Sequence, residues 1–139
     1  MSNMSATRTL IIAALCIGSA SGSLRTASAQ DSTPVIDSVT LRMETHQYDV
    51  VYPEFHFHDA SGSVKFIHRE VIATNSPRAL TVKDAAVFLT AEQQVKGATF
   101  VGRWNCGPEV YDVTLQAFVM NLAGLKSNPG EYTIHCNDG

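Results

Sequence analysis

The strongest constraint on the fold of this chain is an alternation of apolar and polar residues with a period of two. Because neighbouring side chains of a strand point to opposite sides, each alternating segment predicts a strand with one buried face. Gly, Pro, Asn and Asp separate the segments, as is typical of turns between strands. Roughly six or seven short strands without alternating helices predict an all-β fold, a two-sheet sandwich with Greek-key connections. The alternation runs through residues 35–44, 50–58, 63–73, 99–106, 111–119 and 132–136.

The same alternation predicts which side chains face the core. The predicted inward residues are Val35, Val39, Leu41, Met43, Val51, Phe55, Phe57, Phe100, Trp104, Cys106, Tyr111, Val113, Leu115, Ala117, Val119, Tyr132, Ile134 and Cys136. Residues 81–97 break the period and are rich in Ala, Glu, Gln and Lys. Thr81 as N-cap and Gly97 as a stop predict a short helix, while residues 87–89 fit a short edge strand equally well. Both interpretations stay open at this point.

The first 29 residues have the features of a signal peptide. One positive charge, Arg8, precedes an apolar run, and Ala27 and Ala29 form the A-x-A pattern that signal peptidase accepts. The apolar run is shorter than the ~20 residues that cross a bilayer, which favours cleavage after Ala29 over a retained membrane anchor. We therefore expect residues 30–139 to form a single domain, exported to the periplasm or the medium and not inserted in the membrane.

The charge of the predicted mature chain argues against nucleic acid as a partner. Of the ten Lys and Arg residues, Arg8 and Arg25 lie in the signal peptide. The remaining eight are outnumbered by 13 Asp and Glu residues, which gives the mature chain a net charge of −5. An anionic polymer or membrane surface repels a chain of this charge, and the sequence contains no cluster of Lys or Arg that would offset the repulsion. We expect no cofactor, a protein or a glycan as partner, and a monomer or weak oligomer.

Two cysteines remain once the signal peptide is removed, Cys106 and Cys136. An even number of cysteines in an exported chain is typical of a disulfide. If the last three alternating segments are successive antiparallel strands, the two cysteines lie at the same pole, and both have inward parity. The sequence therefore predicts a Cys106–Cys136 bond that closes a loop of roughly 30 residues. Trp104 shares this parity and is expected to pack near the bridge; the alternative is a carbohydrate-binding platform.

The segment YDVTLQAFVMNLAGLKSNPGEYTIHC, residues 111–136, resembles the last hairpin of bacterial immunoglobulin-like and fibronectin type III-like domains. In that family a strand ends in an acidic or amide residue, followed by x-x-G, a polar turn with Ser and a Y-T-I/V strand. The matching residues here are Asn121, Gly124, Ser127 and the run Tyr132 to Ile134. Leu125 departs from the pattern, because the family usually has a polar residue there. The resemblance implies an immunoglobulin-like sandwich with a role in adhesion or as a spacer, no catalytic residues, and a structural tyrosine corner at Tyr111.

The stretch EFHFHD, residues 54–59, raises the question of a metal site, because two histidines one residue apart on a strand are a common metal-binding arrangement. The sequence predicts that residues 50–58 and 63–73 form a hairpin with its turn at 59–62. The number of residues in that turn decides which side of the hairpin carries the histidines.

A four-residue loop stacks apolar residues on apolar ones and places Lys65 beside His56, which disfavours a bound divalent metal. A five-residue loop gathers His56, His58 and His68 into a site suited to Zn or Cu, with Glu54 as a fourth ligand. We favour the first register and expect the two hairpin histidines to lie in solvent.

Catalysis has less support in the sequence. A nucleophile elbow, an H-E-x-x-H motif and a glycine-rich phosphate loop are all absent from it. Asp59 with Asp49 or Glu54 would form a carboxylate pair, and Asp59 could bind calcium, but carboxylates at hairpin tips are typically solvated turn residues. We therefore interpret the chain as a non-catalytic binding or structural module for adhesion or interaction. Two alternatives stay open: a periplasmic metal-binding protein using the His56/His58 hairpin, and a small loop-built hydrolase or inhibitor.

Overall fold

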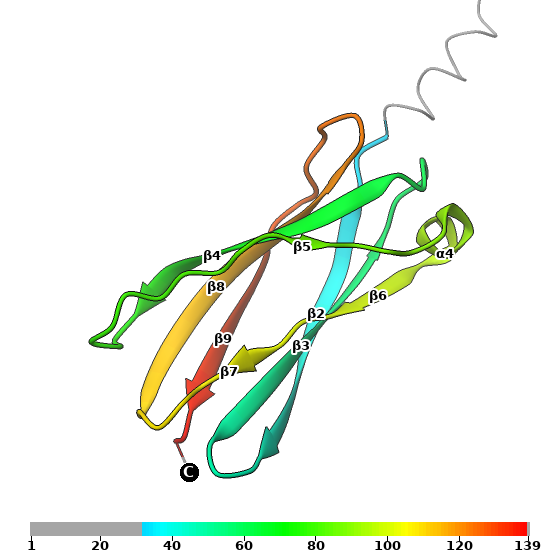
Figure 1. Ribbon diagram of the computed structural model, residues 1–139. Coiled ribbons are helices and arrows are strands. Elements are labelled where there is room, and N and C mark those ends of the chain that lie inside the picture. Colours follow the sequence, from blue (N-terminus) through cyan, green and yellow to red (C-terminus); the bar gives the residue numbers. More distant parts are fainter. Residues whose placement is uncertain (1–31, 139) are drawn as a thin grey trace, which may run out of the picture. The chain divides into compact units, whose positions relative to one another are not determined.

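The computed structural model describes residues 32–138 and shows two antiparallel β-sheets that face each other (Figure 1). The first sheet contains β2 (Val35–Thr45), β3 (Asp49–His58), β6 (Ala98–Val101) and the short β7 (Trp104–Asn105). The second sheet has the order β5 (Ala85–Ala86), β4 (Val64–Thr74), β8 (Tyr111–Asn121) and β9 (Gly130–Cys136). Strands β4 and β8 are neighbours although three strands separate them in sequence, which is a nonlocal pairing of the Greek-key kind. The predicted all-β, two-sheet sandwich is confirmed.

The predicted signal peptide, residues 1–29, lies outside the described residues and stays a prediction. From Thr33 onward the chain forms one compact unit. Within residues 32–138, no helix has the length and apolar character needed to cross a membrane.

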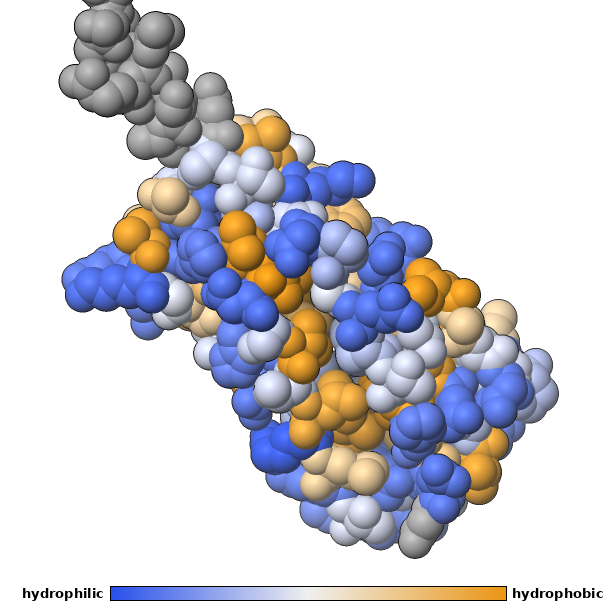
Figure 2. Space-filling model, turned by 180° about the vertical axis from the view of Figure 1, so that it is seen from behind, coloured by the Kyte–Doolittle hydropathy of each residue, from blue (hydrophilic) through white to orange (hydrophobic). Residues whose placement is uncertain are grey.

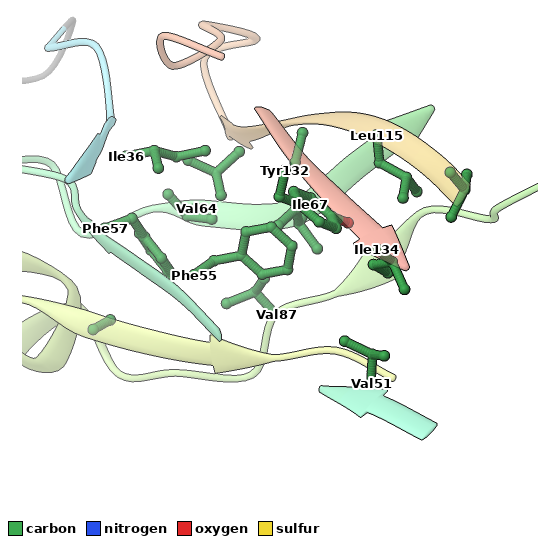
Figure 3. Close-up of a cluster of buried hydrophobic side chains, with 14 of the residues drawn as sticks. Ile36, Val51, Phe55, Phe57, Val64, Ile67, Val87, Leu115, Tyr132 and Ile134 are labelled. Carbon is green, nitrogen blue, oxygen red and sulfur yellow. The ribbon is translucent and has the colours of Figure 1, made fainter. Parts of the chain in front are cut away.

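The core lies between the two sheets and is built as the alternation predicts. Buried residues alternate with less buried ones along most of β3 and along β8 and β9. Phe55 from the first sheet and Leu115 from the second are fully buried. The rings of Phe55 and Tyr132 meet edge to face across the sandwich, with their centroids 5.5 Å apart (Figure 3). Such an aromatic contact adds to the free energy gained by burying apolar surface.

The predicted hairpin between residues 50–58 and 63–73 is wrong. Strand β3 pairs with β2, β6 and β7 in the first sheet, and β4 pairs with β5 and β8 in the second. The residues between β3 and β4 therefore cross from one sheet to the other. The alternation permitted this error because a period of two specifies which side chains point inward. Strands that lie side by side and strands that face each other across a core satisfy it equally.

Asp59 organises this crossing turn. Its carboxylate is fully buried and accepts hydrogen bonds from the Ser61 backbone N–H (3.2 Å), the Ser61 hydroxyl (2.8 Å) and the Ser63 backbone N–H (3.1 Å). Gly62 has a φ of 64°, and a Cβ atom there would lie 2.7 Å from the Cβ of Ala91. The turn therefore requires glycine both for its backbone conformation and for the close approach of Ala91.

The predicted inward face of β2 is only partly buried. Ile36 is buried and Val35 exposed, because the pairing with β3 is irregular between Ile36 and Ser38. Leu41 and Met43 are 43% and 54% exposed and line a cavity of about 190 Å³ beside β9. Strand β2 lies at the edge of its sheet, and these two side chains stay partly exposed to solvent. Figure 2 shows one face of the molecule, with apolar residues in separate groups among polar ones.

The segment 81–97 contains both elements that the sequence left open, at shifted positions. The edge strand is β5 at residues 85–86, and the helix is α4 (Ala91–Lys96), which begins after Thr90 rather than Thr81. Thr90 and Gln93 form a capping box, and the helix ends at Gly97 as predicted. The buried Gln94 side chain accepts a hydrogen bond from the Val64 backbone N–H (2.7 Å) and attaches the helix to the sandwich.

The predicted disulfide between Cys106 and Cys136 is present, with the two Cα atoms 5.5 Å apart. Cys106 follows β7 of the first sheet and Cys136 ends β9 of the second, so the bond joins the two sheets. The strand order that led to the prediction is wrong, because β7 pairs with β3 and not with β8. The pairing survives because both strand ends lie at the same pole of the sandwich and both side chains point inward.

Candidate functional site

The structure does not gather the three predicted metal-binding histidines. His56 and His58 lie on the outward face of β3, where His56 is within hydrogen-bond distance of the Thr99 hydroxyl (3.1 Å) and His58 of the Asp37 carboxylate (2.9 Å). His68 lies in the other sheet, and its Nδ1 is 2.7 Å from the Asp84 carboxylate. The expected partner Lys65 is also in that sheet, so neither predicted register applies.

Asp49 and Asp59, which the sequence offered as a carboxylate pair, lie at opposite ends of β3 and are both buried. The Asp49 carboxylate accepts hydrogen bonds from the Thr45 hydroxyl (3.0 Å) and the Asn137 backbone N–H (2.8 Å). Three donors surround Asp59. The predicted solvated turn carboxylates are therefore structural acceptors that fix two turns, since a buried carboxylate needs such donors.

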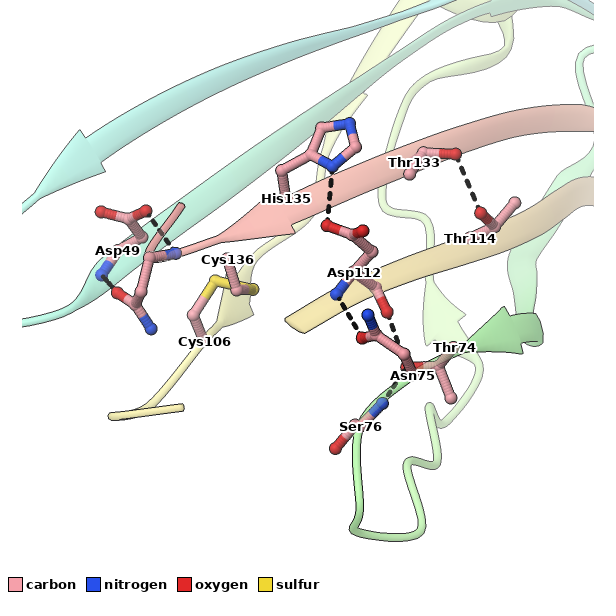
Figure 4. Close-up of polar contacts among 11 residues, drawn as sticks. Asp49, Thr74, Asn75, Ser76, Cys106, Asp112, Thr114, Thr133, His135 and Cys136 are labelled. Atoms are coloured by element: carbon pink, nitrogen blue, oxygen red, sulfur yellow. Dashed lines mark hydrogen bonds and ion pairs between the residues drawn. A yellow bond between two sulfur atoms is a disulfide. The ribbon is translucent and has the colours of Figure 1, made fainter. Parts of the chain in front are cut away.

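A different group of potential metal ligands lies where β8 begins and β9 ends. Asp112, His135 and Asp138 each offer a ligand atom, and these atoms lie within 4.8 Å of one another. All three residues are exposed, and His135 Nδ1 is 2.7 Å from Asp112 Oδ1 (Figure 4). The group escaped sequence reasoning because it depends on the register that sets Asp112 opposite His135. A strand with Asp near its start, paired to one with His near its end, is the signal that would have found it.

We predict that His135 titrates above its usual pKa of 6.5. The hydrogen bond to Asp112 raises the pKa of His135, and the charges of Asp112 and Asp138 act in the same direction. Because the folded-state pKa is raised, the ion pair stabilises the fold fully below the unfolded-state value and loses this effect as the pH rises through the folded-state value. NMR titration of the His135 ring measures the pKa. Asp112→Asn should lower it, and an unchanged value would contradict the pairing.

We also predict that the purified protein retains less than one equivalent of Zn or Cu after mild dialysis, because the histidines of β3 and β4 lie apart. If Zn is added in excess, the weak site should be the exposed group at Asp112, His135 and Asp138, whose imidazole and carboxylates are suitable ligands. His135→Ala should then reduce Zn uptake and His56→Ala should not. Elemental analysis by mass spectrometry decides this, and tight binding that His56→Ala abolishes would contradict our interpretation.

The largest concentration of positive charge lines a cavity of about 520 Å³, which we call the cationic cleft. Segment 78–84, between β4 and β5, forms one wall, and residues 103–105 with Tyr111 form the other. Four of the eight Lys and Arg side chains of residues 32–138 line it. The basic and aromatic side chains of the lining are Arg69, Arg78, Lys83, Arg103, Trp104 and Tyr111.

Arg69 lines the cationic cleft from β4 and is half-buried. It stands opposite the buried Ala117 on β8, and its guanidinium reaches across to the first sheet. A Cβ atom added to Gly102 would lie 3.5 Å from Arg69 Nη1, so glycine leaves the space that the guanidinium occupies. Gly102 separates β6 from β7 and donates its N–H to the Pro53 carbonyl (2.8 Å), which breaks the single strand predicted for residues 99–106.

Two aromatic side chains form a rigid part of the wall. The Trp104 indole N–H donates a hydrogen bond of 3.0 Å to the Tyr111 hydroxyl. Trp104 is partly buried against the core and also lines the cationic cleft, so the packing role and the binding role raised by the sequence are compatible. The Tyr111 hydroxyl is thus paired with the side chain of Trp104, whereas in a tyrosine corner the hydroxyl is paired with a backbone group.

The sequence did not point to the cationic cleft, because its cations are dispersed between positions 69 and 103. Each taken alone has the appearance of a solvated surface charge. The one local signal is Arg69 itself, a cation at an inward-facing place on a strand whose neighbours Ile67 and Val71 pack in the core. A charged residue in such a place has a structural or binding role more often than a surface one.

No protein-family model, no curated protein and no solved structure matches this chain. The resemblance of the last hairpin to immunoglobulin-like domains therefore rests on its residues. The Asn121 side chain accepts hydrogen bonds from the Ala123 and Leu125 backbone N–H groups, both at 3.1 Å. Gly124 has a φ of 82°, and the Ser127 hydroxyl accepts a hydrogen bond from the Val119 N–H (3.0 Å). The quoted pattern thus corresponds to the residues that shape the β8–β9 turn.

Proposed function

We propose that this chain is an exported, non-catalytic binding module, related to immunoglobulin-like and fibronectin type III-like domains, that holds its ligand in the cationic cleft. The observation that carries the proposal is the cleft itself. Its volume of about 520 Å³ lies in the range of small-ligand sites, and its lining combines a majority of charged and polar side chains with the indole of Trp104.

The groups around the cationic cleft favour binding over catalysis. Its lining within residues 32–138 includes no histidine and no cysteine, and its carboxylate, Asp84, accepts a hydrogen bond from His68. A general base needs to reach the substrate with its proton-accepting atom free. The Tyr111 hydroxyl is likewise engaged, by Trp104. The three arginines and Lys83 supply positive charge, and the arginines with the fixed aromatic pair can bind and orient a ligand.

The two alternatives raised by the sequence receive less support. A metal-binding protein would have to use the exposed group at Asp112, His135 and Asp138, because the predicted histidines lie on two sheets. A loop-built hydrolase would need a histidine or a carboxylate on a cavity wall that is free of structural hydrogen bonds. The described cavity that carries two carboxylates and a histidine is lined by Asp49, His135 and Asp138, of which Asp49 is held by Thr45 and Asn137.

Trp104 makes the proposal directly testable, because it is the one tryptophan of the chain. We predict that a library of saccharides, organic acids and peptides contains at least one compound that changes the Trp104 emission in a saturable manner and is recovered chemically unchanged. Arg103→Gln should weaken the binding of this compound. Lys96→Gln on α4, which removes one positive charge outside the cleft, should not.

Two results would contradict the proposal. One is a ligand detected by calorimetry that leaves the Trp104 emission unchanged and shifts NMR signals of the β2 edge instead. The other is conversion of the bound compound to a product. Failure of the whole library and of the native secretome to change the emission would also count against it.

A further inference from the structure

The cationic cleft contains a positive charge that no carboxylate of the described chain neutralises. We propose that its occupant carries an oxyanion on a ring-shaped body and that the Arg69 guanidinium is the group that binds the oxyanion. The inference rests on the proposed function and specifies the chemical class of the ligand. It applies to a carboxylate, a sulfate or a phosphate, since each presents the same pair of acceptor oxygens to an arginine.

The hydrogen bonds of Arg69 leave most of its donors unused. A guanidinium has five N–H donors, and within residues 32–138 that of Arg69 donates one hydrogen bond, from Nη2 to the Lys83 carbonyl at 2.7 Å. Its Nε is buried and has no partner among these residues. Withdrawing a charge from water without a counter-charge is unfavourable, so an anion that reaches this guanidinium gains more than it would at the surface.

The neighbouring cations differ in how far they are compensated. Arg78 is paired with Glu109, with Nε and Oε1 2.7 Å apart. Arg103 donates from Nε to the neutral Asn105 side chain at 3.1 Å, and Lys83 has no ion pair within the described chain. The cleft therefore presents uncompensated positive charge on a domain whose predicted net charge is negative. That local field attracts small anions and does not depend on the overall charge.

The aromatic wall indicates the rest of the ligand. Trp104 and Tyr111 are fixed to each other by their hydrogen bond, and both line the cleft with Arg69. Tyr111 is buried and holds Trp104 in place, and the partly exposed Trp104 indole presents a flat apolar surface against which a sugar ring or an aromatic ring packs at little cost in side-chain entropy. The arrangement suits a ligand with an oxyanion at one end and a flat ring beside it.

The test uses three anions with neutral counterparts: galacturonate and galactose, glucose 6-phosphate and glucose, and benzoate and benzamide. Trp104 emission is titrated with each compound up to about 10 mM, a range that includes weak millimolar affinities. We expect at least one anion to bind at least tenfold more tightly than its neutral counterpart. The three pairs distinguish a sugar acid, a sugar phosphate and an aromatic acid as the source of the oxyanion.

Variants then assign the anion to Arg69. Arg69→Gln should lower the affinity for the tightest-binding anion tenfold or more. Arg69→Lys should keep only part of the affinity, because lysine lacks the planar guanidinium fork. Lys96→Gln should leave the affinity unchanged. Denaturant unfolding verifies that each variant is folded. If Arg69→Gln does not fold, Arg103→Gln, whose side chain is exposed, should still weaken binding of the anion severalfold and weaken binding of its neutral counterpart less.

The outcomes separate the two proposals. If neutral compounds change the Trp104 emission as strongly as their anions do, the oxyanion inference is wrong and the cleft remains the binding site. If none of the three anions changes the Trp104 emission while a neutral library compound changes it, the oxyanion inference is again wrong. If neither these anions nor any library compound affects Trp104, both proposals fail. Equal weakening by Arg69→Gln and Lys96→Gln would also overturn the assignment to Arg69.

Discussion

Removal of the Cys106–Cys136 bond should lower the free energy of unfolding by about 3 to 4 kcal/mol. The bond closes a sequence separation of 30 residues and joins the two sheets at one pole. Without it the unfolded chain gains conformational freedom, and the ends of β7 and β9 are held only by noncovalent contacts. Urea unfolding of the oxidised and reduced protein measures the difference, and the melting temperature should fall by about 10 °C or more.

The double variant Cys106→Ala, Cys136→Ala is the matched control, because it cannot re-form the bond during the measurement. Both cysteines are fully buried, so this variant should be slightly less stable than the reduced protein through the loss of two packed sulfur atoms. Peptide mapping without reductant should show the two cysteine peptides linked. Two free thiols in freshly exported protein, or equal stability of the oxidised and reduced forms, would contradict the prediction.

Truncation of the core should have an effect of similar size. Phe55→Ala and Leu115→Ala should each lower the free energy of unfolding by about 2 to 5 kcal/mol, because each leaves a cavity in a fully buried site. Phe55 should lie near the upper end, since its ring also contacts Tyr132 (5.5 Å between centroids) and Phe100 (6.2 Å). Denaturant unfolding of both variants gives the values.

His58→Ala is the contrasting substitution on the same strand as Phe55. Its side chain is 43% exposed, and its pairing with Asp37 is a surface contact, so the change should cost under about 0.5 kcal/mol. A loss as large as that of Phe55→Ala would mean that the inward and outward faces of β3 are exchanged. It would also contradict the expectation that the His58 side chain lies in solvent.

The corrections share one physical cause. The alternation in residues 50–58 and 63–73 predicted two strands and their buried faces, and both strands exist. Their predicted pairing fails because a turn organised by the buried Asp59 carries the chain to the other sheet. Likewise Leu41 and Met43 have the alternation of core residues but lie at a sheet edge. Local periodicity does not contain the information about neighbours that distinguishes these cases.

The candidate site could be predicted even less. The sequence assigned Trp104 to the surroundings of the disulfide or to a carbohydrate-binding platform, and Tyr111 to a tyrosine corner, but it did not bring the two together in one cleft. As a pair, Arg69 and Arg103 give no sequence signal of a site, since they are 34 positions apart and meet only because β4 of the second sheet and the residue before β7 of the first line one cavity. The histidines suggested a metal site because they are two positions apart, a spacing that places both on one face of a strand, and in β3 that face points outward.

The sequence by itself determined the all-β class, the positions of most strands, the buried residues of β3, β8 and β9, and the pairing of the two cysteines. These follow from periodicity and from counting, which need no knowledge of the partner strands. Only the tertiary structure decided which strands pair, that the disulfide joins the two sheets, and that Arg69, Arg103 and Trp104 surround one cavity. Those features depend on how the two layers pack as a whole, because the free energy of packing is shared among residues far apart in the chain.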